Sequence, residues 1–176
     1  MKLQVSNREM PTLATDSRPQ IAISYFKLLP FRPVDLHCLR IEEILAEKIR
    51  AAYQRCKPRD IWDLDNFASR PLPEALIRKL VVIKLWQARD RFLPEAWNAK
   101  LNDARAWDWD DLRQLVRGGV FDPKQMLDRC ARRFAFLADM NADETTLTAD
   151  PYRRKHDIHQ KLVAECNALV LDHRLA

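Results

Sequence analysis

Glycine is almost absent from this chain of 176 residues, which contains only Gly118 and Gly119. Neither glycine follows a strand-like run of apolar residues, so the sequence offers no glycine-rich turn of the kind that cradles a phosphate group. Cysteine is also scarce: the four cysteines, at positions 38, 56, 130 and 166, are far apart and form no C-x-x-C pair. A structural zinc site and a disulfide framework therefore have no support.

Long apolar runs are missing as well. The chain has no run of about 18 apolar residues, and its first nine residues include several polar ones, so neither a membrane span nor a signal peptide is predicted. We therefore expect a cytoplasmic protein. Apolar residues make up 47% of the chain and charged residues 31%, which suits a globular core under a heavily charged surface. The net charge of +5 mildly favours a polyanionic partner.

The first thirty residues alternate apolar and polar side chains in two places, as half-buried strands do. One alternation contains Leu3 and Val5, and the other contains Ile21, Ile23 and Tyr25. Prolines and small polar residues between 11 and 19 predict a loop, and the prolines at 30 and 33 predict the end of the second strand. Because a two-stranded ribbon is marginally stable alone, we expect these strands to form the edge of a larger sheet, in a chain that begins within a domain.

From residue 41 the apolar spacing becomes that of helices. The clearest stripe runs from Ile41 to Cys56, and Pro58 limits its end. Start signals containing proline or an acidic residue contribute to the prediction of further helices. These are expected at 59–68, 74–89, 110–117, 123–138 and 151–174. The predicted fold class is α+β, and a change of composition at residues 70–71 divides it into a sheet-edge unit at 1–70 and a helical unit at 71–176.

Lys48 lies in the middle of the apolar stripe of the first helix, one turn after Ile44 and Leu45. Its aliphatic stem could cover apolar surface while the ammonium group reaches water, or the cation could bind an anionic ligand at the wall of a cleft. Asp60 and Asp63 share a face of the next helix at i, i+3 spacing. The two carboxylates could converge with Lys48, or they could stabilise a helix start.

Residues 41–51 (IEEILAEKIRA) and 57–64 (KPRDIWDL) together resemble the third and fourth motifs of the AbiEii/AbiGii family of toxin nucleotidyltransferases, which includes the MenT toxins. Intact members use four motifs to transfer a nucleotide from a nucleoside triphosphate (NTP) to an acceptor, which for MenT-type members is tRNA. The resemblance implies that Lys48 and Arg59 bind the substrate, and that the catalytic residues are Lys48, Asp60 and Asp63, with one of the two aspartates assisting catalysis. More loosely, it extends to residues 2–9 and to the helical tail, and so covers nearly the whole chain.

The family's first two motifs, a glycine-containing turn and a strand with two aspartates one residue apart, are expected before residue 1. In the complete enzyme those aspartates would bind the Mg²⁺ that neutralises charge on the transferring phosphates. The resemblance therefore implies Mg²⁺ and an NTP for the complete enzyme, whereas this chain alone offers no metal site.

Three functions remain open from the sequence. In the first, the chain is a truncated nucleotidyltransferase toxin that is inactive alone, with tRNA and a cognate antitoxin as partners. Alternatively, it is a non-catalytic helical module that binds RNA or an antitoxin. The third possibility is a helical interaction protein whose motif match arose by chance.

Other features each have two interpretations. Trp107 and Trp109 could stack on a nucleotide base, although packing at a helix start is the favoured interpretation. The basic stretches at 129–133 and 153–155 could follow an RNA backbone or form solvated helix faces. His156 and His159 lie at i, i+3, but no acidic or cysteine partner shares their face, so surface histidines are expected rather than a metal site.

Overall fold

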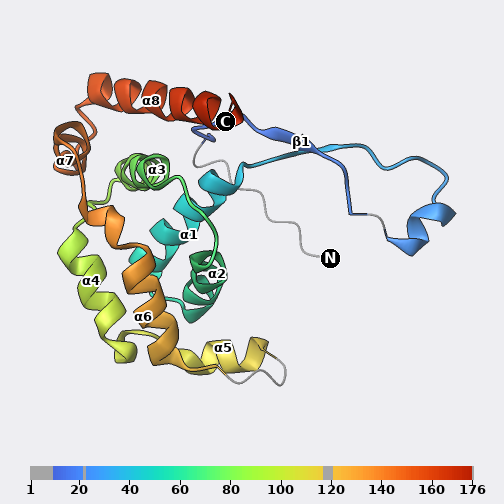
Figure 1. Cartoon of the computed structure of the whole chain (residues 1–176), viewed down its shortest axis with the longest axis horizontal. Helices are drawn as coiled ribbons and strands as arrows, with labels where there is room; N and C mark the ends of the chain where they lie inside the picture. Colours follow the sequence, from blue (N-terminus) through green and yellow to red (C-terminus); the bar gives the residue numbers. More distant parts are fainter. Residues whose placement is uncertain (1–9, 22, 117–120, 176) are drawn as a thin grey trace.

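The computed structural model describes residues 10–21, 23–116 and 121–175, in which a narrow N-terminal ribbon leads into a body of α-helices (Figure 1). The ribbon consists of β1 (Asp16–Arg18) and β2 (Leu36–Cys38), with the 3₁₀ helix η1 (Ser24–Leu28) between them. The body contains α1 (Ile41–Arg55), α2 (Pro58–Ala68), α3 (Glu74–Gln87), α4 (Pro94–Asn102), α5 (Trp109–Leu115), α6 (Pro123–Arg133), α7 (Ala142–Thr148) and α8 (His156–Leu175). Short 3₁₀ helices also occur at η2 (Ala104–Ala106) and η3 (Ala135–Ala138).

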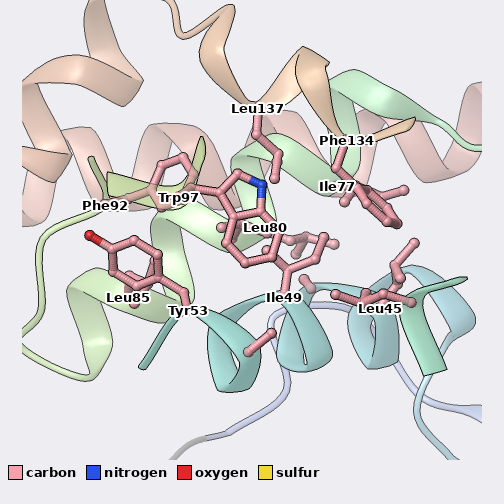
Figure 2. Packing of buried hydrophobic residues seen from close by; sticks show 14 of the residues in the cluster. Leu45, Ile49, Tyr53, Ile77, Leu80, Leu85, Phe92, Trp97, Phe134 and Leu137 are labelled. Carbon is pink, nitrogen blue, oxygen red and sulfur yellow. The ribbon is translucent and has the colours of Figure 1, made fainter. Parts of the chain in front are cut away.

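Helix α3 lies at the centre of the body, and ten of its residues are buried, eight of them apolar. It packs against α1, α7 and α8. The close-up in Figure 2 shows Leu80 of α3 beside Trp97 of α4 and Ile77 of α3 beside Phe134, with Leu45 and Ile49 of α1 on the other side. The apolar stripe of α1 thus forms one wall of the main core.

The helical predictions are confirmed for α1, α2, α3 and α5, with small shifts at their ends. The helix predicted at 123–138 is confirmed as far as Arg133, where α6 ends, and the 3₁₀ helix η3 follows it. Two helices were not predicted, α4 and α7, although each begins with a recognisable signal. Pro94 occupies the first turn of α4, and Asn141 forms a capping box with Glu144 at the start of α7. The last helix begins at His156, five residues later than predicted, because the carboxylate of Asp150 accepts the backbone N–H of Lys155 and holds a turn there.

The prediction of a strand at 21–26 is wrong. Ile21 and Ile23 are exposed, and the segment continues as the 3₁₀ helix η1, so its alternating pattern does not bury one face. The strands lie instead at Asp16–Arg18, inside the predicted loop, and at Leu36–Cys38, beyond the prolines expected to end the second strand. Their antiparallel pairing joins Asp16 to Cys38 and Arg18 to Leu36. The strand predicted around Leu3 lies outside the described residues.

The two units predicted on either side of residue 70 share one apolar core in the described part of the chain. Helix α1 packs on α3, and α2 packs on α6, so both contacts cross the predicted boundary. The division into 1–70 and 71–176 stays a prediction.

Candidate functional site

Lys48 of α1 and the two aspartates of α2 lie together. The Lys48 Nζ is 2.5 Å from Oδ2 of Asp63 and 3.8 Å from Oδ1 of Asp60. The turn between the helices makes this possible: Cys56 adopts a left-handed conformation with φ 49°, which ends α1, and Pro58 starts α2 two residues later. The three predicted residues therefore converge on one site.

Asp60 is the buried part of this site. Its side chain is fully inaccessible to solvent, and Arg55 donates to both of its carboxylate oxygens at 2.8 Å. This hydrogen-bonded ion pair raises the pKa of Arg55 despite the opposing effect of burial. Arg55 was not identified from the sequence, although a basic residue in the last turn of a helix, five residues before an aspartate, was a usable signal.

Asp63 and Lys48 form the accessible part of the site. Their side chains are 39% and 34% exposed, so an ion pair between them can open to admit a ligand from solvent. Asp60 can bind a ligand only if its ion pairs with Arg55 and Lys48 are both broken. The structure thus gives the two aspartates different environments, a difference that the motif alone does not reveal.

Arg59 lies in the first turn of α2, and its side chain is exposed. Its side chain makes no hydrogen bond or ion pair with any residue that the structure describes. A cation in this position is available to an external anion, but the structure does not join Arg59 to Lys48.

The carboxylates of this site do not suit a divalent cation. Both oxygens of Asp60 already accept from Arg55, and Lys48 adds a second positive charge between Asp60 and Asp63. Within the described ranges, no group of three acidic, histidine or cysteine side chains is placed to hold a metal ion. The residues present therefore fit an anionic ligand better than Mg²⁺.

A second, buried ion-pair network fixes the helix that carries Lys48. Lys84 of α3 lies 2.5 Å from Glu43 and 3.0 Å from Glu47, both on α1. Burial tends to lower the pKa of Lys84, but the hydrogen bond to Glu43 and the two acidic charges outweigh it, and the pKa is raised. The carboxylate of Glu43 also accepts the backbone N–H groups of Thr12 and Leu13 at 3.0 Å. This network fixes α1 against α3 and anchors the chain that precedes the ribbon.

The tryptophans considered as a stacking surface are packed into the body. Trp107 is buried and donates its indole N–H to the carbonyl of Lys100, while Trp109 donates to the carbonyl of Ala104. Trp109 also packs beside Phe121. These contacts agree with the favoured interpretation of packed indoles.

The basic stretch at 129–133 is largely neutralised by acidic partners. Arg129 forms a bidentate pair with Asp65, at 2.6 and 2.7 Å, and Arg133 pairs with Glu74. Arg132 is exposed and has no such partner among the described residues. The three arginines line an open pocket of about 430 Å³ at the contact of α2 and α6. Two of these arginines thus connect helices, and only Arg132 remains available to an RNA phosphate.

The two histidines pack against Trp86 of α3. His159 stacks on the indole with ring centroids 4.6 Å apart, His156 meets it edge-on at 5.4 Å, and the Arg153 guanidinium lies over the same ring at 5.1 Å. Burial, together with the positive charges of His156 and Arg153, lowers the pKa of His159. The expectation of plain surface histidines is therefore wrong for His159, which takes part in the junction of α3 and α8.

We expect the free energy of unfolding to fall as the pH drops from about 7 towards 5, and His159→Gln to reduce this fall. The pKa of His159 is lower in the folded protein than its usual value of 6.5, so over this range the unfolded chain binds a proton that the folded protein does not. One titrating group can change the free energy of unfolding by at most about 1.4 kcal/mol per pH unit. Urea denaturation across this pH range measures it. The control is His37→Gln, at an exposed position in β2; an equal change of slope in both variants contradicts the assignment.

Comparison with known proteins identifies the class. A sequence model of the nucleotidyl transferase AbiEii toxin of type IV toxin–antitoxin systems matches residues 1–167. The chain therefore belongs to the AbiEii family of nucleotidyltransferase toxins.

The chain is similar to a solved structure of MenT4, the nucleotidyltransferase toxin Rv2826c from Mycobacterium tuberculosis H37Rv, with a TM-score of 0.74 and 26% sequence identity. The similarity covers 91% of this chain but 56% of the MenT4 chain, so this chain spans little more than half of that protein. A search of curated proteins found no match. None of the helices in the described part of the chain is long and apolar enough to cross a membrane.

Proposed function

We propose that this chain supplies the triphosphate-binding lysine and the assisting carboxylate of a nucleotidyltransferase toxin, which transfers a nucleotide from an NTP to an acceptor such as tRNA. The observation that best supports this function is the accessible Lys48–Asp63 pair beside the buried Asp60–Arg55 pair. A cation whose position is already set by its surroundings can bind a phosphate with little reorganisation.

The geometry suggests a separate role for each residue. A triphosphate competes with Asp63 for the ammonium group of Lys48, and the released Asp63 carboxylate can then accept a hydrogen bond from the hydroxyl group of the acceptor. Asp60 is a positioning residue, because it is inaccessible and contacts both Arg55 and Lys48. Arg59 is a second cation for the triphosphate or for the acceptor.

Magnesium, when bound in such an enzyme, neutralises charge on the transferring phosphates. The carboxylates described here are engaged by Arg55 and Lys48, so we propose that a different segment supplies the metal ligands. It follows that these 176 residues alone transfer no nucleotide. We also propose a cognate antitoxin as a partner, and the cytoplasm as the location, on the basis of the toxin–antitoxin family.

The test compares two proteins incubated with labelled NTPs, Mg²⁺ and total tRNA. One is the chain of 176 residues. The other is a MenT4 chimera, in which this chain is joined to the part of MenT4 that it does not match. Only the chimera is expected to label RNA, and Lys48→Ala is expected to abolish the label. A non-catalytic binding module instead predicts no label from either protein, and a folded chimera without activity would reject the proposed function.

A further inference from the structure

Arg55 has more hydrogen-bonding capacity than its pair with Asp60 uses. A guanidinium group carries five N–H groups in a fixed planar arrangement. In Arg55, Nε donates to Oδ2 of Asp60 and Nη2 donates to Oδ1, both at 2.8 Å. Among the residues that the structure describes, Asp60 is the only acidic partner of Arg55, whose side chain is 48% exposed. The edge of the guanidinium group that includes Nη1 is therefore available to a ligand from solvent.

The guanidinium group of Arg55 lies close to the ammonium group of Lys48. Oδ1 of Asp60 contacts both cations, with Nη2 of Arg55 at 2.8 Å and Nζ of Lys48 at 3.8 Å. The two nitrogen atoms can be no further apart than these two distances combined. Two positive charges this close repel each other, and they stay together here because they share one carboxylate. Asp60 thus holds two partly exposed cations side by side.

The burial of Asp60 suits a role in ligand binding better than a role in stability. The carboxylate is fully buried although its partner Arg55 is half exposed. Taking a carboxylate out of water offsets most of the attraction in an ion pair, so such a pair contributes little net stability. It does fix the guanidinium group before a ligand arrives, which lowers the entropy that binding costs. The arrangement therefore favours an anion that contacts both cations.

A second bidentate arginine–aspartate pair provides a contrast. Arg129 donates to both oxygens of Asp65, and its exposure of 44% is close to that of Arg55. In the part of the chain that the structure describes, however, no second cation forms an ion pair with Asp65. The pair joins α6 to α2 and lies outside the site of Lys48 and Asp63. It is therefore a matched control for Arg55.

We infer that Arg55 binds substrate phosphate beside Lys48, so that the two cations contact neighbouring phosphate groups of the triphosphate. This inference rests on the proposed function, in which Lys48 binds the triphosphate, and it adds a contact whose position is set by Asp60. Neighbouring phosphate groups share a bridging oxygen, so their outer oxygens are close enough together to meet two cations held on one carboxylate. The site therefore favours linked phosphates over a single phosphate.

Binding of inorganic triphosphate to the chain of 176 residues tests the inference without depending on catalysis. Titration followed by nuclear magnetic resonance (NMR) measures the dissociation constant, and inorganic phosphate is the comparison ligand. Arg55→Lys keeps a cation against Asp60 but removes the free guanidinium edge. We expect it to weaken triphosphate binding roughly tenfold, about the effect of losing one hydrogen bond to a charged group. Phosphate binding should change much less, and the matched Arg129→Lys should leave triphosphate binding unchanged.

Equal triphosphate affinities of the natural chain and of a folded Arg55→Lys variant overturn the inference, as does equal weakening by Arg129→Lys. A natural chain that shows no saturable binding also overturns it. Urea denaturation reports whether each variant is folded. If Arg55→Lys does not fold, the decision passes to the side-chain N–H resonances of Arg55 in the natural chain, and resonances that stay unmoved at saturating triphosphate overturn the inference.

The same titration separates this inference from the proposed function. If Lys48→Ala abolishes triphosphate binding while Arg55→Lys retains the natural affinity, the inference fails and the proposed function stands. If the natural chain binds triphosphate through both cations but the folded MenT4 chimera transfers no nucleotide, the phosphate contact of Arg55 stands and the proposed function fails.

Discussion

Lys84→Met is expected to lower the free energy of unfolding by about 3–5 kcal/mol, the range observed when one partner of a buried ion pair is removed. Lys84 and Glu43 are almost completely buried, with 3% and 1% of their side chains exposed. Methionine fills most of the space but leaves the Glu43 carboxylate without its cation in the interior. The loss is expected to be partly reversed by Glu43→Gln in the same chain, because the second substitution removes the uncompensated charge.

The matched control is Lys161→Met. Lys161 pairs with Asp143 at 2.6 Å, but its side chain is 60% exposed, so the expected loss is much smaller than that for Lys84→Met. Urea denaturation of the three variants and the natural chain gives the comparison. If Lys84→Met and Lys161→Met are equally mild, the Lys84 network does not stabilise α1 against α3 as described.

Asp63→Asn is expected to reduce nucleotide transfer by the MenT4 chimera roughly 100-fold or more, the usual effect of removing a residue that assists proton transfer. The amide is nearly the same size as the carboxylate but cannot accept a proton from the acceptor hydroxyl group. Since Asp63 is 39% exposed, the same substitution should change the free energy of unfolding by less than about 1 kcal/mol. Single-turnover labelling of tRNA measures the first effect, and urea denaturation the second.

Asp65→Asn is the control on the same helix, because Asp65 pairs with Arg129 of α6 and lies outside the site. It should leave the transfer rate within about twofold. Asp60→Asn separates positioning from chemistry: it leaves Arg55 without its bidentate partner, so transfer and stability should fall together. The two roles would have to be exchanged if Asp63→Asn left the transfer rate unchanged while Asp60→Asn lowered it strongly without changing the free energy of unfolding.

The sequence indicated that Lys48 could converge with Asp60 and Asp63, as one of two interpretations. Two features carried that prediction: the apolar stripe of α1, and a break of two residues before α2. Both are local properties of the sequence. Helical spacing alone places Lys48 within the apolar stripe of α1 and places Asp60 and Asp63 on one face of α2. The different exposure of the two aspartates was not predictable, because it depends on how the helices pack.

Other parts of the molecule depend on contacts between distant residues. Glu43 and Lys84 lie on different helices, and neither has a neighbour in sequence that indicates the pair. The alternation at 21–25 suggested a strand, but alternation produces a strand only where a surface exists to bury one side, and Ile21 meets none in the described residues. The strands formed instead at Asp16–Arg18, which contains no apolar residue, and at Leu36–Cys38.

The tight connection between α1 and α2 has an evolutionary consequence. Arg55, at the end of α1, forms an ion pair with Asp60 of α2 across the turn. Between them, the left-handed Cys56 ends α1 and Pro58 starts α2, so the connection is as short as two residues. An insertion or deletion of one residue there would change the way α2 packs against α1 and move Asp63 away from Lys48. Homologues that retain this chemistry should therefore keep the number of residues between the lysine and the second aspartate constant, even where the rest of the chain tolerates changes in length.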